Sequence, residues 1–466
     1  GYSKNVLDII ENFQIDPLIK KLNKKKKLYL LIDKFTEFDL HPDKVDNHLM
    51  GSMYEELLRK FSEMSNEESG DHFTPRDIVK LLVSFVFGGD KENLKGGGKI
   101  RSVYDCCCGT GGMLTIGKEW IKENINKDLK VELFGQELND VTYAICKSDF
   151  LMSDENPENI QGPLSSLSED QFSNRKFDYM ITNPPFGVSW KSDEDFVKQE
   201  AKDSNGRFSV GTPRTSDGSL LFLQHLINKM EPSGSRIGIV FNGSPLFTGD
   251  AGSGESEIRK WIIENDWLEC IVSLPDRMFF NTGITTYIWI VTKKKSSERK
   301  GRVQLIDGTS FFTQMRKNLG AKGKYISDDQ IVQLFDIYQK NTEYDEYCKI
   351  YPNNFFGYTK VVIEQPLIKD DNLKTDKQGN PKPDTTKRDS ERVPLSENID
   401  EYYKREVKPY LSNSWMDRSK DKIGYEINFT KYFYKFTPLR SLKDISQDLK
   451  SLDDEIKQLT MEMIDE

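Results

Sequence analysis

The stretch Asn183-Pro184-Pro185-Phe186 combines residue types that could hold a planar group bearing an amine. The amide oxygen accepts hydrogen bonds, and a proline contributes a carbonyl oxygen without an N–H of its own. Each proline fixes its φ and pushes the preceding residue toward extended geometry, so the turn is stiff. The ring of Phe186 offers a face for stacking. The alternative is a proline turn that only closes a strand.

Residues 177–182, directly before this turn, predict a short buried strand because they are apolar, β-branched and aromatic. The turn therefore lies at the carboxyl end of a strand, where open α/β sheets bind their ligands. Two N–H groups of an aromatic amine could donate to the Asn183 amide oxygen and the Pro184 carbonyl. Such bonds localise the amine's lone pair toward an electrophilic methyl group, while Phe186 fixes the ring.

A second candidate site lies where an expected strand, 101–104, is followed by Asp105, three cysteines and Gly109-Thr110-Gly111-Gly112-Met113. The glycines let the backbone turn tightly and bring its amides close to a ligand at the start of a helix. Such a turn could serve a dinucleotide or only pack against its neighbours. Three adjacent thiols cannot converge on one metal as spaced pairs do, so no metal site is expected and the cysteines are interpreted as packing residues.

The next expected strand, 131–134, leads to Glu137. An acid at the end of the second strand is placed to bind a ribose diol, which fits both NAD and S-adenosylmethionine. A Walker lysine is absent, so nucleoside triphosphate hydrolysis is not expected. Nothing resembles a hydride-transfer site, and the turn at Asn183 favours methyl transfer to an amine.

The elements that must position these residues predict an α/β protein. Helical stretches separate apolar strands, which predicts a mostly parallel sheet covered on both faces; the strands are expected at 101–104, 131–134, 177–182, 236–241, 268–274, 285–292 and 302–306. The predicted organisation is a helical domain at 1–70, a catalytic domain at 71–340, a C-terminal extension at 341–440 and a partner-docking helix at 441–466. The polar residues 190–219 are expected to form a mobile substrate loop, and residues near 370–393 an extended or mobile linker.

The net charge of −9 argues against a protein that binds nucleic acid over its whole surface. It leaves room for a local basic cleft, or for a partner that supplies DNA contacts. No apolar run is long enough for a membrane span, and the scattered cysteines fit a reducing cytoplasm. Near the end of the chain a heptad seam predicts pairing with a partner helix; it consists of Leu442, Ile445, Leu449, Leu452, Ile456, Leu459 and Met463.

Together these motifs resemble the methylation subunit of type I restriction-modification systems, a family of S-adenosylmethionine-dependent adenine-N6 DNA methyltransferases. The similarity covers nearly the whole chain and includes 70–76, 105–113, 135–137 and 183–186, with further stretches at 217–222, 243–247, 279–284 and 424–427. It implies a Rossmann-like methyltransferase sheet, preceded by helices and followed by an extension that ends in the heptad helix. It also implies S-adenosylmethionine as cofactor and catalysis by Asn183, Pro184, Pro185 and Phe186.

The resemblance assigns cofactor contacts to four parts of the chain. Residues 70–76 would contact the methionine moiety, and Glu137 would bind the ribose. The glycine-rich turn would also contact the cofactor, and a residue before Leu167 would contact its adenine. The implied contacts are Asp71, His72, Phe73, Thr74, Pro75, Arg76, Asp105, Gly109, Thr110, Gly111, Gly112, Met113, Glu137 and Ser165. Two positions depart from the family. Cys106 replaces a common proline, and Ser165-Ser166 replaces Asn or Asp with Thr, although a serine hydroxyl can still form a hydrogen bond.

The resemblance also implies partners. Proteins of this kind work as two copies with one specificity subunit on double-stranded DNA with a flipped adenine, and a motor-nuclease restriction subunit joins them. The heptad helix would dock onto the specificity subunit. The alternatives are a methyltransferase that acts on protein or RNA, and a catalytically silent scaffold in a DNA-binding complex.

Asp149 and Asp154 are expected to be solvated charges at a helix end.

Overall fold

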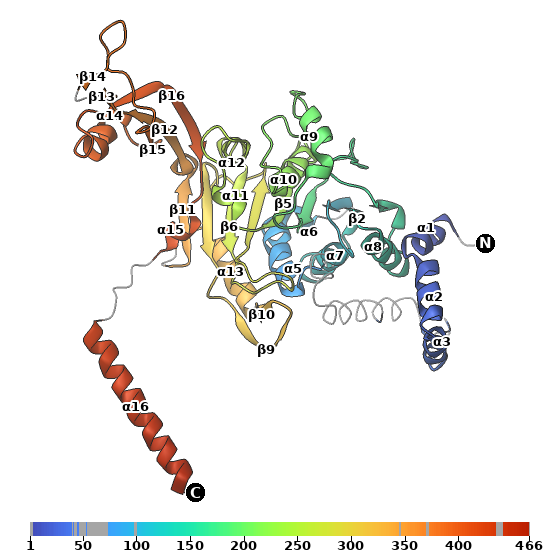
Figure 1. The fold of residues 1–466 in the computed structure, drawn as a ribbon. Helices are drawn as coiled ribbons and strands as arrows, with labels where there is room; N and C mark the ends of the chain where they lie inside the picture. Colours follow the sequence, from blue (N-terminus) through green and yellow to red (C-terminus); the bar gives the residue numbers. More distant parts are fainter. Residues whose placement is uncertain are drawn as a thin grey trace. The chain divides into compact units, whose positions relative to one another are not determined.

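The computed structural model describes residues 3–39, 41, 44–45, 53, 73–96, 100–343, 346–369, 372–434 and 441–465. The chain divides into two compact units, Gly1–Ile427 and Asn428–Glu466, and each is described by itself (Figure 1). The finer domain bounds expected from the sequence stay predictions.

Nine strands of the described residues form one sheet in the order β11-β8-β6-β7-β5-β4-β1-β2-β3. Neighbouring strands among β1 to β5 are parallel, as are β6 and β8, whereas β7 is antiparallel to β5 and β6, and β11 is antiparallel to β8. The strands are β1 (Ile100–Asp105), β2 (Lys130–Gln136), β3 (Ile160–Gln161), β4 (Tyr179–Thr182), β5 (Arg236–Phe241), β6 (Leu268–Ser273), β7 (Tyr287–Thr292), β8 (Arg302–Asp307) and β11 (Cys348–Pro352). All seven strands expected from the sequence form, which confirms the α/β class.

Helices cover both faces of this sheet. On one face, α5 (Arg76–Val83), α7 (Gly112–Asn124), α8 (Asp140–Met152) and α13 (Asp328–Lys340) share a buried apolar cluster with strand residues such as Val103 and Ile181. On the other face, Tyr104 stacks on Phe177 and contacts His225 of α10 (Ser219–Asn228), which lies next to α12 (Gly254–Glu264). Shorter helical segments are η2 (Ser84–Gly88), α6 (Lys91–Lys95), η3 (Pro157–Asn159), η4 (Lys191–Asp193), α9 (Glu194–Glu200), α11 (Ser244–Phe247) and η5 (Asn353–Phe356).

The segment 190–219 is folded, which differs from the mobile loop expected from its composition. It contains η4 and α9. Three of its apolar side chains, Trp190, Val197 and Phe208, are buried with Leu167 and Leu221 in a small core. These apolar residues are widely spaced in a polar stretch. Their partners lie in other parts of the chain, so local composition does not reveal the core.

The N-terminal region is helical where the structure describes it, with α1 (Lys4–Asn12), α2 (Ile15–Lys24) and α3 (Leu28–Thr36). Asp8 of α1 accepts hydrogen bonds from Lys147 and Tyr143 of α8, at 2.6 Å and 2.7 Å. This contact fastens α1 to the sheet domain. Of the helical domain expected at 1–70, residues 46–52 and 54–70 lie outside the described residues.

The C-terminal extension contains a second sheet of β12 (Gly357–Glu364), β15 (Asp389–Pro394) and β16 (Trp415–Tyr425). Residues 372–393, expected to be an extended or mobile linker, include β14 (Asn372–Leu373) and most of β15, which pairs antiparallel with β12. Composition missed this edge strand because its order comes from hydrogen bonds to its neighbour β12, which the polar sequence of the segment itself does not reveal. The remaining elements of the first unit are β9 (Thr313–Leu319), β10 (Lys322–Tyr325), β13 (Ile368–Lys369), α14 (Ile399–Tyr402) and η6 (Tyr403–Val407).

The second unit contains α15 (Phe429–Phe433) and α16 (Leu442–Asp465). The described seam residues of α16 are exposed, from 40% for Ile445 to 85% for Leu442. No helix within the described ranges is both long and apolar enough to cross a membrane.

Candidate active site

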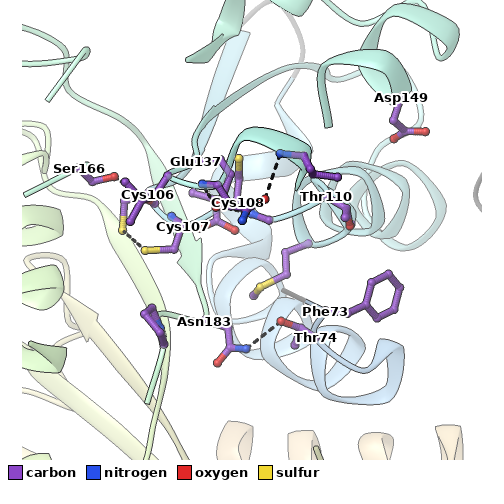
Figure 2. A pocket seen from close by; sticks show the side chains of 18 of the residues that line it. Phe73, Thr74, Cys106, Cys107, Cys108, Thr110, Glu137, Asp149, Ser166 and Asn183 are labelled. Atoms are coloured by element: carbon purple, nitrogen blue, oxygen red, sulfur yellow. Dashed lines mark hydrogen bonds between the residues drawn. The ribbon is translucent and has the colours of Figure 1, made fainter. Parts of the chain in front are cut away.

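The candidate site lies at the switch point of the sheet. From β1 the chain continues outward to β2 and β3, and it then returns to place β4 on the other side of β1. The carboxyl ends of β1 and β4 therefore border a crevice, which is the usual ligand site of such sheets. Asp105 ends β1 and Asn183 follows β4. Both residues line a cavity of about 590 Å³ (Figure 2).

The glycine-rich turn forms one wall of this cavity. Gly109 and Gly111 have φ values of 53° and 85°, which glycine adopts without strain. A Cβ on residue 111 would also approach Cys146 Sγ to 2.8 Å, so glycine is needed for close packing on α8. The turn leads into α7 at Gly112, and its amides lie at the electropositive start of that helix.

Glu137 holds the turn in place. Its Oε2 accepts a hydrogen bond from the Gly109 N–H at 2.8 Å, and its Oε1 accepts one from the Asn139 N–H at 2.8 Å. Each carboxylate oxygen can accept a further bond. Glu137 can therefore support the glycine turn and bind hydroxyl groups in the cavity at the same time.

Asp105 presents an unused acceptor. Its Oδ1 accepts hydrogen bonds from Thr182 Oγ1 at 2.6 Å and from the Cys107 N–H at 3.0 Å. Its buried Oδ2 has no partner among the described residues. Burial raises the pKa of this carboxyl to about 7, and the nearby Glu137 charge acts in the same direction. A donor or a positive charge in the cavity would satisfy the Oδ2 atom.

The Asn183 amide is oriented by a residue from the start of the catalytic region. Its Nδ2 donates to Thr74 Oγ1 at 3.0 Å, whereas its buried Oδ1 has no partner in the described structure (Figure 2). The bond to Thr74 uses the donor side of the amide. The acceptor side is left for a ligand that carries N–H groups.

A second cavity of about 270 Å³ lies against the Asn-Pro-Pro-Phe turn, and Asn183 and Pro185 line both cavities. Phe186 meets Phe279 edge to face, with ring centroids 5.5 Å apart. The wall residues are Asn183, Pro184, Pro185, Phe186, Val188, Asn242, Phe279, Asn281, Thr282 and Ile284. The roles of Asn242 and Phe279 were not predicted. Asn242 follows β5 in the same way that Asn183 follows β4. This shared position after a buried strand is the sequence feature that could have indicated Asn242 as a site residue.

The structure brings most of the predicted site residues together. Those that line the larger cavity are Phe73, Thr74, Arg76, Asp105, Gly109, Thr110, Gly112, Met113, Glu137, Ser165, Asn183 and Pro185. Pro184 and Phe186 face the smaller cavity, whereas Pro75 is buried and Gly111 packs against α8. Asp71 and His72 lie outside the described residues. The assigned roles of all these residues stay predictions.

Other residues around the larger cavity were missed or misjudged. Asp149 is 9% exposed and lines the cavity, so its interpretation as a solvated helix-end charge was wrong; Asp154, by contrast, is exposed. The three adjacent cysteines also line the cavity, beyond the packing role expected of them. Further wall residues include Leu138, Asn139, Ser166 and Phe222. No cluster of three potential metal ligands occurs in the described part of the chain.

Comparisons with known proteins add to this geometry. A family model described as N-6 DNA Methylase matches residues 45–354. The type I restriction enzyme MjaIX methylase subunit of Methanocaldococcus jannaschii is 26% identical over 347 residues, which cover 73% of this chain and 57% of the relative. The HindI methylase subunit of Haemophilus influenzae is 30% identical over 259 residues, which cover 56% of this chain and 54% of the relative. The chain thus spans little more than half the length of these relatives.

Two solved structures share the fold. The type I restriction-modification methyltransferase subunit of Streptococcus thermophilus has a TM-score of 0.57 at 23% identity, over 70% of this chain and 65% of that one. A structure from a study of type I restriction-modification complex assembly has a TM-score of 0.53 at 20% identity, over 94% of this chain and 74% of that one. They confirm the expected sheet with helices on both faces.

Proposed function

Because the chain belongs to the N-6 DNA Methylase family, we propose that it transfers a methyl group from S-adenosylmethionine to the exocyclic amine of adenine in DNA. The observation that carries this proposal is the Asn183 amide. Its Nδ2 donates to Thr74, and its buried Oδ1, which lies beside a second cavity, has no partner among the residues that the structure describes. A primary aromatic amine supplies the N–H groups that this acceptor lacks.

The larger cavity suits the cofactor. Its size lies within the range of ordinary small-molecule sites. Asp105 Oδ2 is a buried acceptor without a described partner, which suits a ligand that carries N–H groups or positive charge. When bound, S-adenosylmethionine supplies an electrophilic methyl group.

We assign the cofactor's parts to the cavity walls in the order that the resemblance implies. Phe73, Thr74 and Arg76, with the predicted contacts Asp71, His72 and Pro75, would hold the methionine end. The turn that follows Asp105 would contact the middle of the molecule, with Glu137 binding the ribose hydroxyls and Ser165 the adenine. Bonds from the hydroxyls would use the second lone pair of each Glu137 oxygen.

The smaller cavity is proposed to hold the target adenine. The Asn183 Oδ1 and the Pro184 carbonyl accept the two N–H groups of the amine, so the nitrogen lone pair is concentrated on the atom that attacks. Phe186 stacks on the base, and Phe279 supports Phe186 from its edge. Accepting the methyl group would leave the adenine nitrogen between Asn183 Oδ1 and the Pro184 carbonyl cationic, and this nitrogen would then lose a proton. The described wall of this cavity has no histidine or carboxylate, so solvent accepts that proton.

A base inside a duplex cannot enter such a cavity while stacked, so we propose that double-stranded DNA binds with the adenine flipped out. We further propose a specificity subunit, a second copy of this chain and a restriction subunit as partners. The names of the relatives as methylase subunits of type I enzymes support this assembly. We place it in the cytoplasm, and the absence of a disulfide among the six cysteines supports a reducing setting.

The test is methyl transfer by the chain co-purified with the specificity subunit encoded beside it. Duplex DNA is incubated with cofactor that is isotopically labelled in the methyl group, and the DNA is digested to nucleosides. We expect label in N6-methyldeoxyadenosine. Label in a cytosine product would contradict the adenine assignment. Cofactor binding without transfer to DNA would favour a silent scaffold, or an enzyme with another acceptor.

A further inference from the structure

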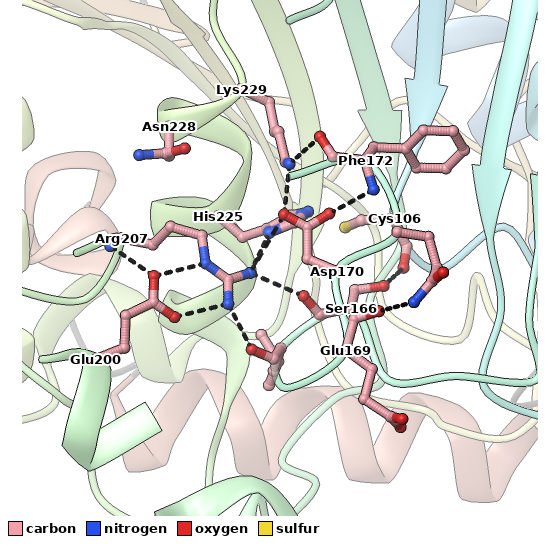
Figure 3. Close-up of polar contacts among 12 residues, drawn as sticks. Cys106, Ser166, Glu169, Asp170, Phe172, Glu200, Arg207, His225, Asn228 and Lys229 are labelled. Carbon is pink, nitrogen blue, oxygen red and sulfur yellow. Dashed lines mark hydrogen bonds and ion pairs between the residues drawn. The ribbon is translucent and has the colours of Figure 1, made fainter. Parts of the chain in front are cut away.

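A cluster of buried and partly buried charged and polar side chains lies beside the larger cavity and takes no part in the proposed transfer. Its members are Asp170, Glu200, Arg207, His225 and Lys229 (Figure 3). Arg207 belongs to the folded segment 190–219, and its side chain is 8% exposed. Glu200, at the end of α9, holds the Arg207 guanidinium with both oxygens: Nε donates to Oε1 at 2.8 Å and Nη2 donates to Oε2 at 2.7 Å. Such a paired contact fixes the plane of the guanidinium.

The rest of the Arg207 guanidinium holds the backbone of a neighbouring loop. Nη1 donates to the Ser166 carbonyl at 3.0 Å, and Nη2 donates to the Leu167 carbonyl at 2.7 Å. Nη1 also donates to His225 Nδ1 at 2.8 Å. These contacts give an acceptor to each of the five N–H groups that an arginine carries. A lysine has neither the fork nor the number of donors needed to replace them.

His225 carries the same network to β1. A guanidinium can only donate, so His225 Nδ1 accepts and the proton of the neutral ring lies on Nε2. Nε2 then donates to Tyr104 Oη at 3.1 Å. Tyr104 directly precedes Asp105 in β1. Burial lowers the pKa of His225 well below its usual value, and the charges of Arg207 and Lys229 lower it further, which keeps the ring neutral.

Lys229 holds the other end of the loop. Its Nζ donates to Asp170 Oδ2 at 2.5 Å and to the Phe172 carbonyl at 2.5 Å. The two cations, Arg207 and Lys229, are thus balanced by the two carboxylates of Asp170 and Glu200. A buried cluster is stable only when its charges are paired in this way. The loop from 166 to 172 is therefore clamped near both ends.

The clamped loop forms the wall of the cavity to which the resemblance assigns the cofactor's adenine. Ser165 and Ser166 both line the cavity. Their hydroxyls also order the loop, because Ser165 Oγ accepts from the Leu167 N–H at 3.2 Å and Ser166 Oγ donates to the Cys106 carbonyl at 2.5 Å. A shift of the carbonyls held by Arg207 would move both serines.

We infer that Arg207 is a positioning residue for cofactor binding, and that the folding of segment 190–219 sets the shape of the adenine end of the cavity. This inference rests on the proposed function, because it takes S-adenosylmethionine as the ligand. Arg207 itself does not line the cavity. It acts through the backbone of Ser166 and Leu167.

The test compares Arg207→Ala and Arg207→Lys with Arg214→Ala in the full chain. Arg214 is a matched control because it lies in the same segment but is 52% exposed and pairs with Glu255. Binding of S-adenosylmethionine is measured by calorimetry, and hydrogen exchange of residues 163–172 is measured without cofactor. We expect Arg207→Ala to weaken binding about ten-fold or more and to speed exchange in that loop. Arg214→Ala should change binding by less than about two-fold.

A kinetic readout separates positioning from general damage. Arg207→Ala should raise the KM for cofactor while kcat at saturating cofactor stays within about two-fold of the wild type. If Arg207→Ala does not fold, Arg207→Lys decides: weakening of about three-fold or more supports the inference, and binding within about two-fold overturns it. A wild-type chain that fails to bind the cofactor would instead refute the proposed function.

Discussion

Thr74 is the residue that fixes the orientation of the Asn183 side-chain amide. The resemblance implies that Thr74 contacts the cofactor, whereas its hydroxyl lies 3.0 Å from Asn183 Nδ2. Without this partner, the amide loses the bond that turns its oxygen toward the acceptor cavity. A hydrogen bond of this kind contributes about 1 kcal/mol, and a buried polar group left without its partner costs about 1–3 kcal/mol.

Thr74→Val tests this role because it keeps the side-chain volume and removes the hydroxyl. We expect kcat to fall about ten-fold or more, and cofactor affinity, to which Thr74 is also proposed to contribute, to fall by a smaller factor. Thr74→Ser, which keeps the hydroxyl, should retain most of the activity. Unchanged kcat with a raised KM for cofactor would show that Thr74 serves the cofactor alone.

Asp105 should make cofactor binding depend on pH. Burial raises the pKa of Asp105 to about 7 in the cavity without a ligand. S-adenosylmethionine carries a sulfonium and an ammonium group, and a nearby cation favours the carboxylate, so binding lowers this pKa. Below about pH 7 binding should therefore release a proton, so affinity should rise with pH up to about pH 7, by at most ten-fold per pH unit, and level off above it.

Calorimetry in two buffers of different ionisation enthalpy measures the released proton directly. Asp105→Asn should abolish both the proton release and this part of the pH dependence. Proton uptake on binding, or an equal release by Asp105→Asn, would contradict the assignment.

For single residues, the sequence predicted the side chains at strand ends, because Asp105 ends one strand, and Glu137 and Asn183 follow the ends of two others. It did not predict the bond from Thr74 to Asn183 or the buried position of Asp149. Those features arise from residues that are far apart in the chain and meet only when the sheet has formed.

Among the elements, the strands of the central sheet were the most predictable. β5, β6 and β7 are buried along their whole length, so their sequences are almost continuous apolar runs. Segment 190–219 and strand β15 were not predicted, because their polar compositions resemble those of loops. Their order comes from contacts with distant parts of the chain, such as Leu167 for the first and β12 for the second.

A buried ion pair joins two of these strands. Arg236 of β5 and Glu269 of β6 lie 2.6 Å apart and are 5% and 2% exposed, and Tyr338 of α13 donates to Glu269. Burial alone would raise the pKa of Glu269, but Arg236 holds it below its usual range. Arg236 begins β5, and Asn242 of the acceptor cavity follows the last residue of the same strand, so the pair lies at the end of β5 away from that cavity.

Arg236→Met should lower the free energy of unfolding by about 3–5 kcal/mol, because Glu269 is then buried without its cation. Arg236→Met combined with Glu269→Met should recover much of this loss. The measurement is chemical denaturation. Lys34→Met, which breaks the exposed pair with Glu37, is the control and should cost less than about 1 kcal/mol. A double variant as unstable as the single one would show that the pair itself stabilises the fold.

For the molecule as a whole, α16 is the element that we propose binds a partner helix. Its apolar heptad seam was predicted from the sequence period, and the helix forms, with its described seam residues exposed. The identity of the partner cannot be read from a heptad pattern, because many helices satisfy the same spacing.

Leu449→Asp combined with Leu452→Asp should abolish co-purification with the specificity subunit, because both charges would be buried in the helical interface. Gln447→Asp adds an acid at a position outside the seam and should leave assembly intact. Cofactor binding should stay within about two-fold of the wild type in both variants. A complex that survives the double substitution would place the docking surface elsewhere.

The central claim is that Asn183 directs methyl transfer to adenine in DNA. The most direct measurement is single-molecule sequencing for modified bases in DNA from cells that express this chain with its specificity subunit, beside an Asn183→Ala control. We predict N6-methyladenine confined to one recognition motif in the wild type and absent from the control. No modified adenine in the wild type, with assembly and cofactor binding confirmed, or equal modification by Asn183→Ala, would contradict the account.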